Sequence, residues 1–208
     1  MNQEHPLVYF ARHGQTTFNK ADAFRGNINA PLDAQGWRDA NKLKKYFDGV
    51  EFSHIFTSDK IRAEQTAGKI AEGHNQTPVE NEGLRSWDVG YLSGKPKDEE
   101  NLEAIEYYVN NPDLPIPDGE SLNEFKARVQ PLIKNAIELA LACGNPVLVI
   151  AHSSVIHEVG AMIGGHHEYA LVEPGGVTVI FIQDGKFDAE PIFKPKDAVG
   201  QQRGETIT

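Results

Sequence analysis

Two histidines and two arginines lie where apolar runs of the sequence end. Arg12 and His13 directly follow one such run, His152 follows another, and Arg62 lies a few residues beyond a third. A neutral imidazole can attack phosphorus when one ring nitrogen is free and an acceptor holds the other. Arginines and a second imidazole supply the cationic donors that a phosphoryl group needs in its transition state. These residue types therefore fit phosphoryl transfer.

Residues beside these four extend the pattern, but structural roles explain it as well. Gly14 allows a close approach of the backbone, and Asn19 adds a neutral donor. Equally, His13 fits a hydrogen-bonded turn residue, Arg62 a solvated helix residue, and His152 a cap at a strand end. The tripeptide Arg-His-Gly alone does not decide between these interpretations.

The elements that must position these residues alternate between strands and helices. Ser58 is expected to cap the second helix, Ser121 and Glu124 form a capping-box pattern, and Pro131 predicts a kink. The predicted strands are residues 7–11, 54–57, 79–82, 146–151 and 177–182. The predicted helices are residues 33–47, 58–71, 99–109, 120–143 and 155–163.

This alternation predicts one α/β domain over residues 1–208, with a mainly parallel central sheet. In such sheets, ligands bind beyond the carboxyl ends of the strands. The segments expected to meet there are 12–14, 58–62 and 152–153. The last of them adds Ser153 to the candidate binding residues.

Two stretches depart from the alternation. An irregular section at about residues 90–118 is rich in Gly and Pro and is long enough to act as a lid over a site. The tail at about residues 195–208 has no hydrophobic periodicity, which fits either an edge strand or a disordered end.

Composition narrows the classes of partner. The 208 residues include 30 acidic and 20 basic side chains, for a net charge of −10, without the basic excess typical of nucleic-acid binders. The single cysteine excludes an internal disulfide, and no run approaches the roughly 20 apolar residues of a membrane span. The first residues do not resemble a secretory leader, so we expect a cytoplasmic protein. The oligomeric state is not indicated.

Five ordered motifs resemble the histidine phosphatase superfamily, the phosphoglycerate mutase-like proteins. They are FARHGQTTFN at 10–19, FRG at 24–26, SDKIRAEQTA at 58–67, GES at 119–121 and VLVIAHSSVI at 147–156. The resemblance extends over about residues 7–165 and is specific, because the motifs occur in the family's order. It implies an α/β/α sandwich that acts on a small phosphorylated substrate without a metal or another cofactor.

The resemblance also implies roles for the matching positions. His13 would be the nucleophile that carries the phosphoryl group. The pocket around the phosphate would be completed by Arg12, Arg62 and His152. The residues that contact the phosphate or the adjoining substrate would be Asn19 and Arg25, with Gly14 and Ser153 beside them.

One position departs from the family's pattern. Many members carry a glutamate that protonates the leaving oxygen, and the corresponding position here holds Ser86. Asp88 is one candidate for the acid, and Glu82 is a weaker one. Asp88 fits equally well as a turn carboxylate between Trp87 and Gly90. Without a dedicated acid, the enzyme would prefer good leaving groups such as acyl or aryl phosphates, phosphoanhydrides and phosphoramidates.

Three functions fit these residues. The first is a phosphohydrolase that releases inorganic phosphate from a small metabolite. The second is a phosphoglycerate mutase-like isomerase. The missing glutamate and a chain that is short for that branch argue against it. The third is a protein that binds phosphorylated ligands without catalysis, which the intact set of histidines and arginines argues against.

Overall fold

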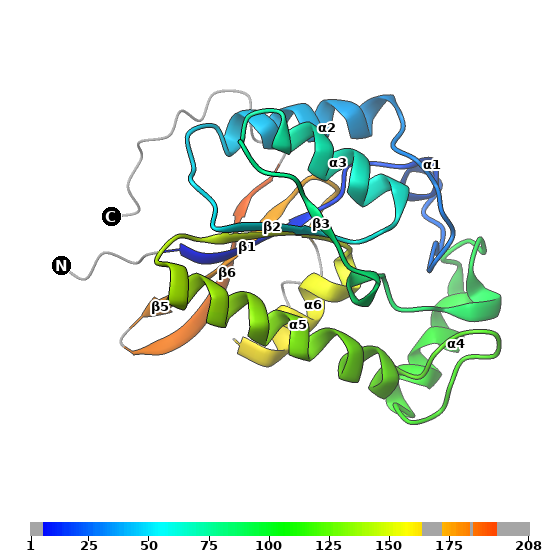
Figure 1. Ribbon diagram of the computed structural model, residues 1–208. Coiled ribbons are helices and arrows are strands. Elements are labelled where there is room, and N and C mark those ends of the chain that lie inside the picture. The colour runs from blue at the N-terminus through cyan, green and yellow to red at the C-terminus, as the bar shows by residue number, and fades with distance from the viewer. Residues whose placement is uncertain (1–5, 164–171, 184, 195–208) are drawn as a thin grey trace.

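The computed structural model describes residues 6–163, 172–183 and 185–194 (Figure 1). The α-helices are α1 (Thr17–Lys20), α2 (Ala34–Tyr46), α3 (Ile61–Ala71), α4 (Glu99–Asn110), α5 (Leu122–Cys143) and α6 (Ser153–Ile163). The strands are β1 (Pro6–Arg12), β2 (His54–Thr57), β3 (Val79–Glu80), β4 (Val147–Ala151), β5 (Val177–Gln183) and β6 (Lys186–Phe193). Two short 3₁₀ helices, η1 (Glu82–Leu84) and η2 (Gly90–Leu92), lie between β3 and α4.

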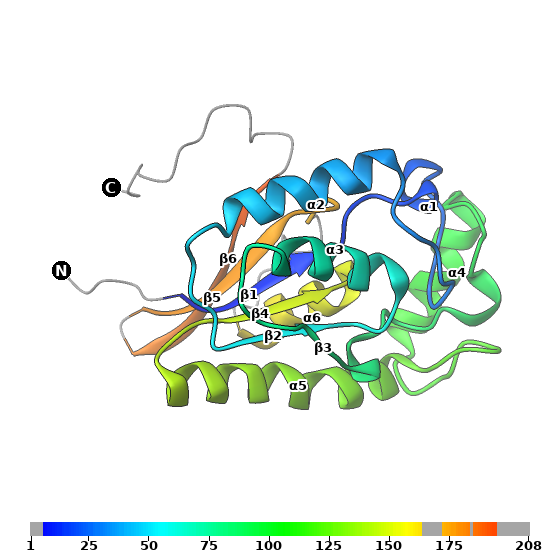
Figure 2. The same ribbon diagram turned by 45° about the horizontal axis from the view of Figure 1, so that its top comes forward.

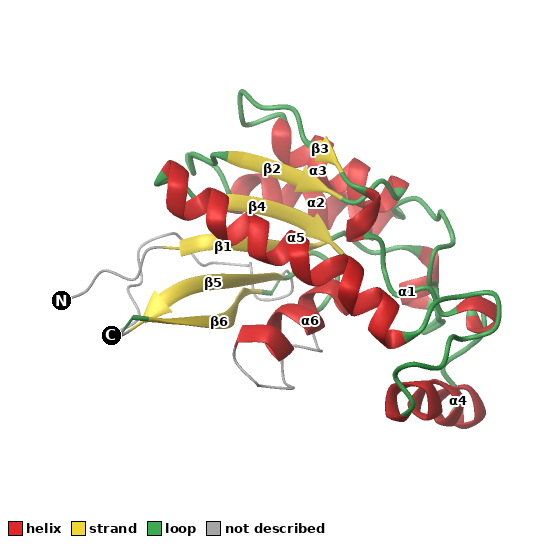
Figure 3. Ribbon diagram, turned by 60° about the horizontal axis from the view of Figure 1, so that its bottom comes forward, coloured by secondary structure: helices red, strands yellow, loops and turns green. Residues whose placement is uncertain are grey.

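The strands form one six-stranded sheet in the order β3-β2-β4-β1-β5-β6. The first four strands of this order are parallel, and β5 and β6 run antiparallel to their neighbours. Helices α2 and α3 cover one face (Figure 2), and α5 and α6 cover the other (Figure 3). The predicted α/β/α sandwich with a mainly parallel sheet is therefore confirmed.

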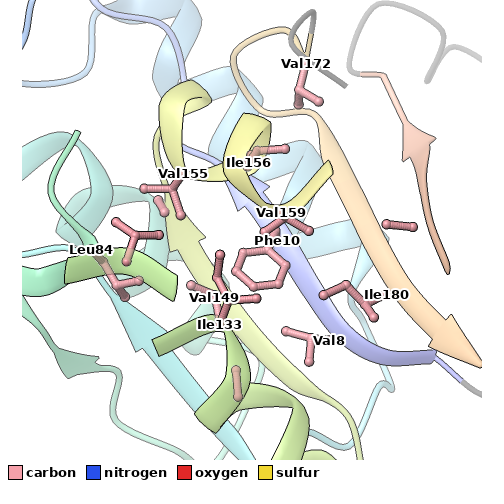
Figure 4. Packing of buried hydrophobic residues seen from close by; sticks show 14 of the residues in the cluster. Val8, Phe10, Leu84, Ile133, Val149, Val155, Ile156, Val159, Val172 and Ile180 are labelled. Atoms are coloured by element: carbon pink, nitrogen blue, oxygen red, sulfur yellow. The ribbon is translucent and has the colours of Figure 1, made fainter. Parts of the chain in front are cut away.

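A hydrophobic core lies on each face of the sheet, because β4 is buried along its whole length and its side chains alternate between the faces. Val149 packs with Phe10, Ile133 of α5 and Val159 of α6 (Figure 4). Ile150 belongs to the cluster beneath α2 and α3. The central strands are thus held from both sides, which fixes the positions of their carboxyl ends.

The predicted strands and helices are present, with local differences. The short helices α1, η1 and η2 were not predicted, and β3 ends at Glu80 rather than at residue 82. Ser58 does not cap a helix: α3 begins at Ile61, and the residue at its N-cap position, Lys60, makes no side-chain capping bond. Strand β6 was not predicted from the sequence. It carries Pro191, which an edge strand tolerates because its outer side needs no backbone donors.

The capping box at α5 is confirmed, since Ser121 and Glu124 exchange hydrogen bonds between side chain and backbone. Pro131 lies inside this helix. None of the helices in the described ranges is long and apolar enough to cross a membrane. The tail at about residues 195–208 lies outside the described residues.

The section predicted to be a lid contains η2 and α4, and none of the residues of α4 is buried. Its first part pairs with the chain that follows α1. Phe24 donates its N–H to Lys95 O (2.9 Å) and accepts the N–H of Gly94 (2.8 Å). Figure 3 shows β2 and β4 pointing toward the end of the molecule where α1 and α4 lie. The section therefore borders the carboxyl ends of the parallel strands.

Candidate active site

The register of the parallel strands brings the two histidines together. Arg12, the last residue of β1, lies opposite Ala151, the last residue of β4, so His13 and His152 leave adjacent strand ends. Their ring centroids are 5.3 Å apart, and both side chains are fully buried. Ser58 follows β2 on the other side of β4 and donates its N–H to Ile150 O (3.0 Å). The predicted convergence of the three segments is present in the fold.

Hydrogen bonds fix the tautomer of His13. Its Nδ1 lies 2.6 Å from Gly14 O, which can only accept, so Nδ1 carries the hydrogen. Its Nε2 lies 2.8 Å from Nη2 of Arg25, which can only donate, so Nε2 presents its lone pair. Burial and then the nearby Arg25 and Arg62 cations lower the pKa of His13 well below its usual value. The imidazole is thus neutral and Nε2 is nucleophilic.

His152 lies beside the nucleophile with one nitrogen engaged. Its Nε2 is 3.0 Å from Ser58 Oγ, while no protein atom of the described residues bonds to its buried Nδ1. Burial and then the Arg62 and Arg25 cations lower the pKa of His152 well below its usual value. Ser58, predicted to cap a helix, instead orients this second imidazole.

Three guanidinium groups surround the histidines. Arg62, on the first turn of α3, is fully buried and donates to Ile28 O (2.8 Å) and Gly26 O (3.2 Å). Arg12 donates to Val172 O (2.6 Å). Burial and then the charge of Arg12 lower the pKa of Arg62 to about 9, and burial lowers that of Arg12 to about 10 despite nearby Glu173. Both guanidiniums stay charged at neutral pH.

Arg25 lies between the nucleophile and helix α1. Besides its bond to His13, it donates through Nη1 to Thr16 Oγ1 (3.1 Å) and to Asn19 Oδ1 (3.0 Å). Burial and the charges of Arg62 and Arg12 lower its pKa. Within the described residues, no ion pair joins Arg25 or Arg62 to a carboxylate.

Several buried polar atoms of the site have no hydrogen-bond partner among the described residues, and they are guanidinium N–H donors and one imidazole nitrogen. Within the described part of the chain, Nε of each guanidinium and Nδ1 of His152 are buried without a hydrogen-bond partner. Buried polar groups without partners are costly, and so are buried cations without a counter-charge. An anion bound between the arginines would relieve both costs. The arrangement therefore favours an anionic ligand beside Nε2 of His13.

Gly14 and Asn19, both predicted to contact the ligand, make contacts within the protein. Gly14 accepts from His13 and donates its N–H to Thr66 Oγ1 (3.1 Å). A Cβ at Gly14 would lie 2.4 Å from Gly36 O, so only glycine fits there. Asn19 Oδ1 accepts from the N–H and the hydroxyl of Thr16 as well as from Arg25.

A cavity of about 280 Å³ lies beside these groups, and its described lining does not include His13, Arg62 or His152. Arg12, Arg25 and Asn19 line it, as do Ser153 and Ser154 at the start of α6, where the first N–H groups of a helix favour anions. The other lining residues are Ala23, Phe24, Gly26, Ser86, Trp87, Val89, Lys97, Ile105 and His157. None of these described lining residues is an aspartate or a glutamate.

Both carboxylates considered as the acid have other partners. Asp88 accepts from Asn27 Nδ2 (2.9 Å) through one oxygen and from the N–H of Gly90 (3.2 Å) through the other. The side chain of Glu82 is 77% exposed and pairs with Arg85 Nη1 at 3.2 Å. Neither lines the cavity, whereas Ser86 does.

The fold and the motifs together define the family. The chain belongs to the histidine phosphatase superfamily (branch 1), which matches it over residues 8–192. The resemblance stated from the sequence is confirmed. Members of this family are enzymes that act on small phosphorylated substrates.

Three relatives illustrate the range of the family. A 2,3-bisphosphoglycerate-dependent phosphoglycerate mutase of Allorhizobium ampelinum is 30% identical, over 95% of this chain and 97% of that protein. A phosphoglycerate mutase from Bacillus anthracis superimposes with a TM-score of 0.78 and 24% identity, over 93% of this chain and 95% of that one. The alpha-ribazole phosphatase from Shigella flexneri gives a TM-score of 0.72 and 22% identity, over 94% and 98%. At these identities the two structures show the shared fold alone.

The first relative corrects one argument made from the sequence. Because almost all of that mutase is matched, the length of this chain does not separate a phosphatase from a mutase.

The cavity also contains residues that the sequence interpretation missed. Ser154 and His157 line it from α6 together with Ser153. His157 lies three residues after Ser154 and four after Ser153, and this spacing is the signal that places His157 on the same helix face as the two serines.

Proposed function

We propose that this protein is a phosphohydrolase that cleaves a small organic phosphomonoester through a phosphohistidine on His13. The observation that carries the proposal is the neutral His13, whose Nε2 lone pair lies among three guanidinium groups, two of which, Arg25 and Arg62, are buried. A nucleophile with a fixed tautomer and a surrounding set of donors meets the two requirements of phosphoryl transfer.

The first step forms a bond between Nε2 and phosphorus and breaks the bond from phosphorus to the leaving oxygen. The leaving oxygen departs as an anion and takes its proton from solvent water. Arg25 exchanges its bond to Nε2 for bonds to the phosphoryl oxygens as phosphorus approaches. Nδ1 keeps its hydrogen, so the phosphorylated ring is cationic, and the bond to Gly14 O stabilises that charge. Arg12, Arg62 and Nδ1 of His152 supply further donors, in the positions where metal ions act in other phosphoryl-transfer enzymes.

In the second step, water attacks phosphorus and the P–N bond breaks. His13 returns to its neutral form and inorganic phosphate leaves. Hydrolysis needs only access for water, whereas a mutase must return the phosphoryl group to a product alcohol and deprotonate that alcohol. The lack of a carboxylate among the described lining residues supports hydrolysis over this return.

A mutase is the second candidate because the relative that matches nearly the whole chain carries that name. The section at 90–118 acts as the lid in either case, since Lys97 and Ile105 contribute to the cavity.

The test is hydrolysis of p-nitrophenyl phosphate in the presence of EDTA by wild type and His13→Ala. We expect turnover by wild type, no loss on chelation, and a fall of at least about 10³-fold in His13→Ala. A parallel assay follows conversion of 3-phosphoglycerate to 2-phosphoglycerate with and without a bisphosphate primer. Primer-dependent conversion without net phosphate release would establish the mutase and overturn the proposal.

A further inference from the structure

We propose that the hydroxyl pair Ser86–Ser154 donates a hydrogen bond, but no proton, to the leaving-group oxygen, so that substrates whose leaving oxygen is weakly basic are favoured. The inference rests on the proposed hydrolysis and concerns the other side of the reacting phosphorus. Both serines line the cavity with Arg12 and Arg25. Their Oγ atoms are 3.0 Å apart, although the residues are 68 positions apart in the sequence.

Of the two hydroxyl hydrogens of Ser86 and Ser154, one remains free to donate to an atom in the cavity. The N–H of Trp87 donates to Ser154 Oγ (3.1 Å), since a backbone N–H cannot accept. The two hydroxyls share two hydrogens, and one of them is used in the bond between the serines. The second remains available to an oxygen in the cavity.

The hydrogen bond from Trp87 N–H to Ser154 favours one direction for the hydrogen bonds that follow it. A hydroxyl that accepts a hydrogen bond becomes a better donor, which favours the order in which Ser154 donates to Ser86 and Ser86 donates to the cavity. Ser86 is therefore the group that contacts the substrate, and Ser154 is a positioning residue.

Hydrogen bonds from Arg128 and to Glu120 hold residues 85–87, and with them the Ser86 hydroxyl, in place. Arg128 of α5 donates to Arg85 O (3.0 Å) and to Ser86 O (3.3 Å), and it pairs with Glu120. Trp87 Nε1 donates to the carbonyl of Glu120 (3.1 Å). Donors that are fixed before the reaction stabilise developing charge without reorganisation.

A hydroxyl at this position donates a hydrogen bond but does not deliver its proton at neutral pH. The negative charge that develops on the leaving oxygen is therefore stabilised rather than neutralised. Aryl, enol and acyl phosphates leave with a weakly basic oxygen and are the favoured class, and alkyl phosphates react slowly. The benefit of the hydrogen bond grows as the leaving oxygen becomes more basic.

The experiment measures kcat/KM for aryl phosphates of graded leaving-group pKa and for one alkyl phosphate. Wild type is compared with Ser86→Ala, Ser86→Thr and Ser154→Ala. We expect Ser86→Ala to lose less than about twofold with p-nitrophenyl phosphate and about tenfold with phenyl or alkyl phosphates. Ser86→Thr keeps a hydroxyl and should keep the wild-type dependence. Ser154→Ala should show a smaller graded loss.

Ser86→Cys serves as a second variant if Ser86→Ala does not fold, because a thiol of similar size is a weak donor and should give the same graded loss. Ser53→Ala is the control, since its hydroxyl bonds to carbonyls of the loop before β4, away from the cavity. An equal loss across the series in the Ser86 variants would overturn the inference, as would a larger loss in Ser154→Ala. A wild type that hydrolyses no member of the series would instead overturn the proposed function and this inference with it.

Discussion

The two halves of the candidate active site are built in different ways. The half that holds the nucleophile comes from the carboxyl ends of β1 and β4 and the start of α3, and His13, Arg62 and His152 are fully buried there. The half that receives the leaving group comes from irregular chain after η1 and from α4, which has no buried residue. Central strands fix the first half, whereas the second is attached mainly through loops.

The electrostatics of the two halves differ in the same way. In the nucleophile half, no ion pair of the described residues joins Arg25 or Arg62 to a carboxylate. In the other half, Lys97 is 41% exposed and pairs with Asp22 at 3.3 Å, beside the apolar side chains of Phe24 and Ile105. A rigid set of guanidinium groups suits the one group that all the substrates share, the phosphoryl group. A partly exposed and largely apolar wall suits a leaving group that differs between family members.

After the loss of the nucleophile itself, the largest expected effect comes from the rigid half, at Arg62. Arg62→Lys keeps a charge but cannot donate to both Ile28 O and Gly26 O while also reaching the phosphoryl group. We expect kcat/KM for p-nitrophenyl phosphate to fall about 10²- to 10³-fold, the usual cost of losing one such donor. Competitive inhibition by inorganic phosphate should weaken in the same variant.

Arg38→Lys is the matched control. Arg38 is an arginine on α2 whose Nε donates to Gln35 at the exposed surface. Its substitution should leave both quantities within about twofold, as expected for a surface change. Equal small effects in the two variants would mean that the buried guanidiniums do not hold the phosphoryl group.

The same division explains how much the sequence could predict. The strand ends were predictable, because apolar runs such as 146–151 have few interpretations and parallel strands align their carboxyl ends. The function of Ser58 was not predictable, because its bond to His152 joins residues 94 positions apart and competes with a local capping pattern. The leaving-group half was harder still. Neither Trp87 nor Ile105 carries a local signal that distinguishes a cavity wall from a core position.

The second expected effect is on stability and again concerns the buried half. His13 and His152 have pKa values well below 6.5 when folded, and near 6.5 when unfolded. Below pH 6.5 the unfolded chain therefore binds protons that the folded chain does not. The free energy of unfolding should fall with falling pH, by up to about 1.4 kcal/mol per pH unit for each histidine.

Urea unfolding between pH 7.5 and 5.5 in phosphate-free buffer measures this slope. His152→Gln should lose part of it, because glutamine does not titrate. His74→Gln should change this slope less. Partial burial lowers the pKa of His74, but its side chain stays partly exposed to solvent. A slope that is the same in wild type and His152→Gln would show that the imidazole of His152 is not held neutral by burial.

The smallest expected effect lies in the exposed half, at Ile105. Ile105→Ala removes apolar contact with the leaving group and leaves the arginines untouched. We expect KM for a bulky aryl phosphate to rise about three- to tenfold, at about 0.8 kcal/mol per buried CH₂, with kcat and inhibition by inorganic phosphate unchanged. Val109→Ala is the control, since Val109 is on the same helix, is 46% exposed and does not line the cavity. If inhibition by inorganic phosphate weakened by a similar factor in Ile105→Ala, the two halves would not be independent. Helix α4 would then stabilise the phosphoryl pocket as well as select the leaving group.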